Sequence, residues 1–240
     1  MSQERTEALV LRGVDFSETS RIVTFLTPDR GVVTCMAKGA RRKRSPLAAA
    51  LDTFNRVELV YYWKDGRSVQ TLAEASVLDG FRRLKADLEK SAYAAFPVEL
   101  AGKAAGENAP AHGLYDTLVR GLAGMETWSG DVRTHACWQA LHLLTEAGFA
   151  PVLGRCAHTG QPITGACGFR LDSGVVAPGE RADRRLPAEV HDALCRLAEH
   201  GEACPEIAVD RAVFYVLRHY AAYQLESDFR SARVIEQMFD

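Results

Sequence analysis

Residues 21–44 read RIVTFLTPDRGVVTCMAKGARRKR, and this stretch decides the fold of the N-terminal part of the chain. Segments 21–26 and 32–37 are rich in β-branched and aromatic residues, which favour strands. Between them lies a turn sequence, Thr27-Pro-Asp-Arg-Gly31, in which proline fixes φ and glycine accepts a positive φ. The stretch therefore predicts a β-hairpin that runs directly into a strongly basic segment.

Three further strands are predicted, one before this hairpin and two after it. Residues 8–11 form a short apolar run, and segments 54–63 and 68–77 flank an Asp65-Gly66 pair, a strong hairpin signal. No long helical pattern interrupts them. Because five short antiparallel strands can close into a small barrel without sheet edges, we expect an OB-fold barrel over residues 1–79.

Alternation along the fourth strand predicts which side chains face the barrel core. Arg56, Glu58 and Tyr62 share the face expected to be exposed. The opposite face, expected in the core, carries Val57, Leu59, Tyr61 and Trp63. Tyr62 is therefore a better candidate for stacking on a nucleic-acid base than the two core aromatics.

From Gly80 the apolar residues recur at helical spacing, so an α-helical body is predicted. Pro97 either kinks the first helix or begins the next one, Asp131 is a predicted N-cap and Gly148 a predicted helix end. The expected architecture is α+β and multidomain. Its parts are the barrel (1–79), a helical domain in two pieces (80–150 and 187–240), and a small Cys-containing, zinc-ribbon-like insertion (151–186).

The cysteines suggest a metal site in or near this insertion. Because disulfides rarely persist in the cytoplasm, we expect the six cysteines to be free thiols or metal ligands. Four of the six cysteines lie close in sequence, and we expect a structural zinc ion bound by Cys156, Cys167, Cys195 and Cys204, with His158 as an alternative ligand. Because no C-x-x-C pair is present, the alternative is an empty site with Cys195 buried in a helix.

Motifs of catalysis are missing from the sequence. It contains no P-loop, no G-x-G-x-x-G, no G-x-S-x-G and no H-E-x-x-H. His135 and His142 lie seven residues apart, and no carboxylate pair stands out as an acid and base. We therefore expect a protein that is not an enzyme. The sequence also lacks a run of 18 apolar residues and an N-terminal signal sequence, so we expect no membrane span and a cytoplasmic location.

The basic segment, Lys38–Arg44, stands out because the whole chain has a formal net charge of -2. Residues 1–79 hold 12 Lys and Arg against 10 Asp and Glu, so the excess is confined to this segment. Such a run either is simply solvated or binds a polyanion, since each cation that meets a phosphate releases counterions. The expected DNA-binding residues are Lys38, Arg41, Arg42, Lys43, Arg44, Arg21, Arg56 and Tyr62.

The order of several segments resembles the N-terminus of the bacterial recombination mediator family RecO. They are Ala8-Leu-Val-Leu11, Glu18 to Ile22, Thr27-Pro-Asp-Arg-Gly31, Lys38-Gly39-Ala40-Arg41-Arg42 and Phe54. The resemblance extends along the whole chain. It implies a non-enzymatic DNA repair protein of the RecF pathway, associated with the nucleoid. It would bind single- and double-stranded DNA and anneal complementary strands. With RecR, it would load RecA onto strands coated by single-strand-binding protein (SSB).

The resemblance also implies two further sites. Zinc in this family is held by two C-x-x-C pairs, but Cys156 is followed by Thr159, Ala177 and Glu180 at the remaining positions, so any zinc must be bound differently. The C-terminal tail of SSB would need an apolar pocket ringed by cations. Candidate rim residues are Arg120, Arg133, Arg211 and Arg218.

Two alternatives remain at this point. An RNA-binding or ribosome-associated OB-fold protein would use the same basic segment, and dependence on the 2′-hydroxyl would reveal it. A metalloenzyme built on the cysteine cluster would need an open coordination position and a nearby base.

Overall fold

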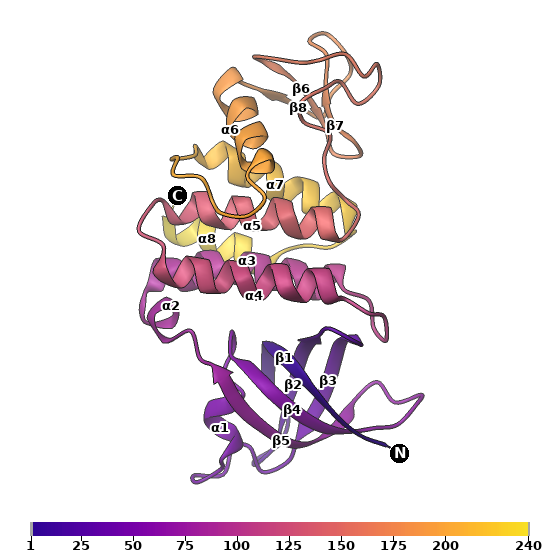
Figure 1. Ribbon diagram of the computed structural model, residues 1–240, viewed down its shortest axis with the longest axis vertical. Coiled ribbons are helices and arrows are strands. Elements are labelled where there is room, and N and C mark those ends of the chain that lie inside the picture. Colours follow the sequence, from indigo (N-terminus) through magenta and orange to yellow (C-terminus); the bar gives the residue numbers. More distant parts are fainter. Residues whose placement is uncertain (1, 240) are drawn as a thin grey trace. The chain divides into compact units, whose positions relative to one another are not determined.

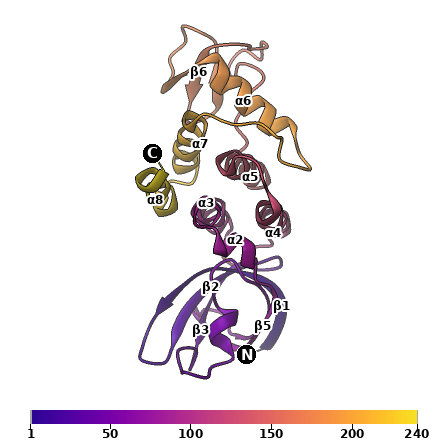
Figure 2. The same cartoon turned by 90° about the vertical axis from the view of Figure 1, so that its left-hand side faces the viewer.

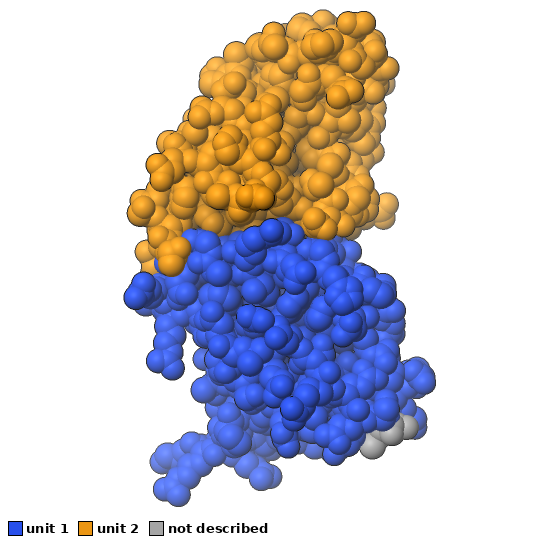
Figure 3. Space-filling model, in the orientation of Figure 1, with its two compact units in different colours: residues 1–86, 101–126 blue, residues 87–100, 127–240 orange. Residues whose placement is uncertain are grey.

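A computed structural model describes residues 2–239 of the chain (Figures 1 and 2). It contains two compact units, residues 1–86 with 101–126 and residues 87–100 with 127–240 (Figure 3). Among the helices of residues 2–239, none combines the length and the apolar character that crossing a bilayer requires.

The first unit is built on a five-stranded barrel. Its strands are β1 (Ser2–Asp15), β2 (Arg21–Thr27), β3 (Gly31–Ala37), β4 (Arg56–Trp63) and β5 (Gln70–Asp79). They close in the order β1-β2-β3-β5-β4, with β3 and β5 parallel and the other pairs antiparallel. The short helix α1 (Leu47–Ala50) lies between β3 and β4. This confirms the predicted OB-fold and the α+β class.

Strand β1 is much longer than the predicted segment 8–11. Residues 2–9 pair with β4, and residues 9–15 pair with β2. The register with β2 shifts between Val10 and Arg12, as at a β-bulge. The polar ends of β1 are held by backbone pairing on the two sides, a long-range property that apolar patterning does not show.

The barrel core follows the predicted alternation. Val57, Leu59 and Tyr61 of β4 are buried in one cluster with Phe25 of β2. Trp63 is only partly buried and packs against this cluster from the end of the strand. Tyr62, on the opposite face, is 36% exposed, as the pattern predicted.

The predicted hairpin β2–β3 forms, and its turn also fastens β1 and β4. Gly31 has φ 59°, and a Cβ atom there would lie 2.2 Å from the carbonyl oxygen of Gly106, so this position requires glycine. Arg30 donates to both carboxylate oxygens of Glu4, at 2.5 and 2.6 Å. The guanidinium carbon of Arg30 lies 4.1 Å from the ring centroid of Trp63, a cation–π contact.

Helices α2 (Arg82–Ala86) and α4 (His112–Thr127) complete the first unit, and α3 (Leu88–Ala104) contributes to both units. Pro97 lies inside α3, so it does not begin a new helix. The missing N–H of proline removes one backbone hydrogen bond at this point.

The second unit combines helices with a small sheet. Its remaining helices are α5 (Val132–Glu146), α6 (Ala188–Glu199), α7 (Arg211–Gln224) and α8 (Arg230–Phe239). The sheet has the order β7-β6-β8, with β6 (Cys167–Arg170), β7 (Gly174–Val176) and β8 (Arg184–Leu186). The predicted N-cap at Asp131 is confirmed, because its carboxylate accepts from the backbone N–H of Thr134 at 3.1 Å.

Candidate nucleic-acid interface

The basic segment forms consecutive turns between β3 and α1. Ala40 is buried in the barrel core and anchors the middle of the segment. The side chains around it are exposed, namely Lys38, Arg41, Arg42, Lys43 and Arg44. The segment therefore presents its five cations to solvent from a backbone that is fixed at its centre.

Arg41 differs from its neighbours because it is bound to the rest of the barrel. Its Nη1 donates to the carbonyl oxygen of Ser17 at 2.7 Å, and its Nε lies 3.1 Å from Asp15 Oδ2. Its backbone N–H also donates to the carbonyl oxygen of Thr19 at 3.0 Å. Arg41 thus fastens the basic segment to the turn between β1 and β2.

The other four cations of the basic segment differ from Arg41 in their surroundings. Within residues 2–239, no ion pair involves Lys38, Arg42, Lys43 or Arg44. Since no carboxylate of this described part of the chain pairs with them, their charge is available to an anion such as phosphate.

Arg21 and Arg56, also expected to bind DNA, are paired with carboxylates. Arg21 Nε lies 3.3 Å from Asp15 Oδ1, and Arg56 Nη2 donates to Glu7 Oε2 at 2.6 Å. A phosphate would have to compete with these carboxylates. We therefore expect these two arginines to contribute less to phosphate binding than the four cations of the basic segment that have no ion pair within residues 2–239.

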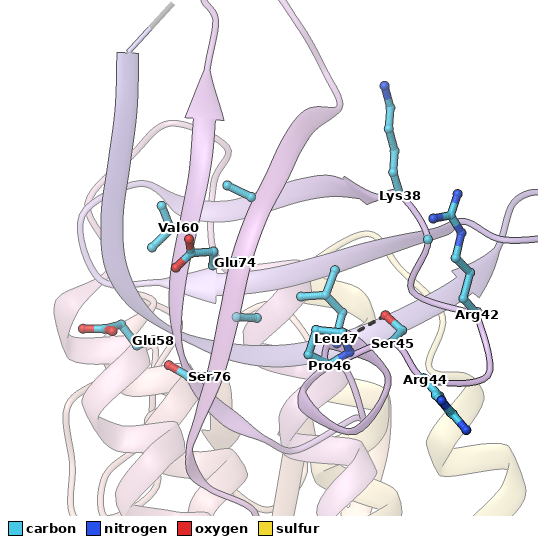
Figure 4. A pocket seen from close by; sticks show the side chains of 13 residues that line it. Lys38, Arg42, Arg44, Ser45, Pro46, Leu47, Glu58, Val60, Glu74 and Ser76 are labelled. Carbon is cyan, nitrogen blue, oxygen red and sulfur yellow. Dashed lines mark hydrogen bonds between the residues drawn. The ribbon is translucent and has the colours of Figure 1, made fainter.

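A groove with a volume of about 620 Å³ lies beside the basic segment (Figure 4). We call it the barrel groove; its lining residues are Lys38, Gly39, Arg42, Arg44, Ser45, Pro46, Leu47, Glu58, Val60 and Ala73–Ser76. In Figure 4 the three cations lie on one side and the two carboxylates on the other, with Pro46 and Leu47 between them. The groove is thus polarised from a positive to a negative side.

The outer face of β4 contributes Glu58 and Val60 to the groove lining. Val60 and Tyr62 alternate along the same face, and Tyr62 is exposed. On the neighbouring strand β1, Arg5 lies opposite Val60 in the strand register, and the Arg5 side chain is 67% exposed. The sequence reasoning missed Arg5, because the predicted first strand began only at residue 8.

The four cysteines expected to bind zinc do not gather into one metal-binding group within residues 2–239, although Cys167 and Cys195 lie near enough to interact electrostatically. Cys156 Sγ donates to Glu180 Oε1 at 3.3 Å, Cys195 Sγ lies 3.5 Å from His191 Nε2, and Cys204 Sγ donates to the Pro205 carbonyl oxygen at 3.7 Å. Cys167 is buried in β6. In the described part of the chain, His, Cys, Asp and Glu side chains form no group of three or more suited to a metal ion.

The positions that match the RecO zinc pattern nevertheless come together. Hydrogen bonds from Thr159 lower the pKa of the Cys156 thiol. Glu180 Oε2 lies 2.6 Å from His158 Nδ1, and this hydrogen bond is the main reason that the pKa of Glu180 lies below its usual value. Of the four positions that carry cysteine in the family's zinc pattern, only Cys156 is a thiol here, and Ala177 has no side-chain donor. These residues therefore do not fit a tetrahedral zinc ion. Hydrogen bonds hold this turn together instead.

A second pocket lies in the second unit, with a volume of about 410 Å³. Its apolar part includes Leu186, Pro187, Val190 and Val216. Arg184 and Arg185, both exposed, also line it, together with Ala212, Tyr215 and His219. We call it the arginine-rimmed pocket. The rim residues proposed from the sequence, Arg120, Arg133, Arg211 and Arg218, are not among its lining residues.

Comparisons with known proteins agree along the whole length of the chain. Residues 1–81 match the family model "Recombination protein O N terminal", and residues 85–233 match "Recombination protein O C terminal". A DNA repair protein RecO from Anaeromyxobacter dehalogenans is 33% identical over 210 residues, covering 85% of this chain and 82% of the relative. One from Salinibacter ruber is 32% identical over 245 residues, covering 98% and 94%.

Proposed function

The chain belongs to the recombination protein O (RecO) family, and we propose that it binds DNA and anneals complementary strands during DNA repair. The observation that carries this proposal is the exposed basic segment on an OB-fold barrel, with four cations free of carboxylate partners within residues 2–239. OB-folds bind single strands through a basic groove for the backbone and aromatic side chains for the bases.

Annealing requires no covalent chemistry. Two strands repel each other through their phosphates, and a cationic surface that binds both lowers this repulsion and raises their local concentration. Lys38, Arg42, Lys43 and Arg44 would bind phosphates, with Tyr62 stacking on a base. We therefore infer a DNA-binding protein that is not an enzyme and acts on the nucleoid in the cytoplasm.

The partners in this proposal follow from family membership. With RecR, the protein would help to load RecA onto single strands coated by SSB. The arginine-rimmed pocket suits the acidic tail of SSB, because its arginines can pair with carboxylates while Leu186 and Val190 pack against an apolar tail end.

Strand annealing tests the proposal. Two complementary oligonucleotides, one carrying a fluorophore and the other a quencher, are mixed at 50 mM and 200 mM salt with the wild type or with an Arg42→Ala/Lys43→Ala/Arg44→Ala variant. Arg41 is retained because it fastens the segment. The wild type should accelerate annealing most at low salt, and the variant should lose most of this acceleration.

The matched control removes three exposed arginines from the second unit, in an Arg155→Ala/Arg181→Ala/Arg196→Ala variant. It should anneal like the wild type. Equal rates for all three proteins would reject the basic segment as the DNA site. An RNA competitor that binds far more tightly than DNA of the same sequence would instead favour an RNA-binding protein.

A further inference from the structure

The barrel groove has two electrostatic sides, and one kind of ligand satisfies both. Lys38, Arg42 and Arg44 line one side, while Glu58 and Glu74 line the other (Figure 4). A bare phosphate chain running through the whole groove would meet the two carboxylates and be repelled. A nucleotide suits both sides, because its phosphate is anionic and some bases carry an amino group that a carboxylate can accept from.

The apolar part of the groove lining is suited to the flat face of a base. Among the lining residues, Val60 of β4 and Leu47 of α1 carry apolar side chains between the carboxylates and the cations (Figure 4). Leu47 is held in place because its backbone N–H donates to Ser45 Oγ at 3.3 Å, the bond drawn in Figure 4. The volume of about 620 Å³ lies within the range of about 300–1,000 Å³ typical of small-ligand sites.

Glu74 is the carboxylate best placed to accept a hydrogen bond from a base. It is exposed on β5, opposite Val60 in the strand register. Within residues 2–239 it has no ion pair, whereas Glu58 Oε1 lies 3.5 Å from Arg5 Nη1. Carboxylates accept from the N4 amino group of cytosine, whereas uracil and thymine present an oxygen at this position.

We propose that the barrel groove binds one nucleotide of single-stranded DNA and prefers an amino-bearing base, cytosine above all. The phosphate lies against Lys38, Arg42 and Arg44, the base lies against Val60 and Leu47, and Glu74 accepts from the amino group. This inference rests on the proposed DNA binding and adds base preference to it. Uracil or thymine at the same place would put two acceptors face to face.

Fluorescence anisotropy with labelled oligo(dC) and oligo(dU) of equal length tests this inference at neutral pH and low salt. The two oligonucleotides carry the same phosphates and differ at position 4 of the base. The wild type should bind oligo(dC) about fivefold more tightly, the lower end of what one carboxylate–amino contact contributes to discrimination. A Glu58→Gln/Glu74→Gln variant should bind both equally, because each amide can donate as well as accept.

The control is a Glu107→Gln/Asp116→Asn variant, which removes two exposed carboxylates of the first unit outside the groove and should keep the preference. Equal affinity of the wild type for the two oligonucleotides would overturn the inference and leave DNA binding intact. A cytosine preference that survives in Glu58→Gln/Glu74→Gln would overturn the assignment to this groove. Failure to bind either oligonucleotide would overturn the proposed function itself.

Discussion

Arg41 Nε and Asp15 Oδ2 lie 3.1 Å apart, so the basic segment is tied by an ion pair to the end of β1. The same carboxylate group lies 3.3 Å from Arg21 Nε through its other oxygen. One aspartate thus restrains two of the cations that the sequence predicted to bind DNA. It separates Arg21 and Arg41 from Lys38, Arg42, Lys43 and Arg44, which have no carboxylate partner within residues 2–239, and its charge also lowers the positive potential of this surface.

Removing this carboxylate should strengthen DNA binding. In an Asp15→Asn variant, one negative charge is lost and Arg21 and Arg41 can turn to phosphate. We expect the affinity for single-stranded DNA to rise about threefold to tenfold at 50 mM salt, with a steeper salt dependence. Anisotropy titrations measure both quantities. Asp116→Asn, on α4, is the control for charge alone, and a lower affinity of Asp15→Asn would contradict the expectation.

Glu4 should contribute to stability in a pH-dependent way. Hydrogen bonds from Arg30 are the main cause that holds the pKa of Glu4 below its ordinary value, and the Tyr61 hydroxyl also donates to this carboxylate at 3.0 Å. Because folding lowers the pKa of Glu4, this carboxylate stabilises the folded state fully at pH values above its unfolded-state pKa. The stabilisation is lost as pH falls through its lower folded-state pKa.

Urea unfolding of Glu4→Gln at several pH values tests this expectation. At pH 7 we expect a loss of about 1–2 kcal/mol in the free energy of unfolding, typical of charged hydrogen bonds that are partly exposed. As pH falls through the lowered folded-state pKa of Glu4, the difference between wild type and variant should shrink, because Glu4 then becomes protonated in the folded state as well. A difference that stays constant with pH would show that Glu4 stabilises the barrel by packing alone.

The arginine-rimmed pocket should bind an acidic peptide. A labelled peptide from the SSB C-terminal tail should lose about tenfold or more in affinity for an Arg184→Ala/Arg185→Ala variant, since two charge-assisted contacts are removed. The control variant Arg155→Ala/Arg181→Ala keeps the pocket and should bind normally. Equal affinities of the two variants would place the tail site elsewhere.

Features of the fold that depend on residues close in sequence could be predicted, whereas features that depend on residues far apart in the chain could not. The hairpin over 21–37, the caps at Asp131 and the core face of β4 rest on neighbours in sequence, and each was predicted correctly. The length of β1, the pairing of Arg41 with Asp15 and the barrel groove depend on partners far apart in the chain. Residue patterning alone could not supply these partners.

The surroundings of Cys156 likewise depend on residues far apart in the chain. Nearness in sequence grouped Cys156 with three other thiols, whereas the fold places Glu180 and His158 around it. Glu180→Ala should therefore lower the melting temperature, and a zinc chelator should leave the melting temperature of the wild type unchanged. Zinc at one equivalent per chain, together with melting at a lower temperature after chelation, would contradict this expectation.

The salt dependence of DNA binding by the basic segment is the most direct test of the function proposed for this protein. Affinity for single-stranded DNA is measured across a salt series for the wild type and for Arg42→Ala/Lys43→Ala/Arg44→Ala. The plot of log affinity against log salt should become shallower by about 2 in the variant, since each phosphate contact to a single strand contributes about 0.7 to the slope. An unchanged slope and affinity would show that DNA binds to another surface.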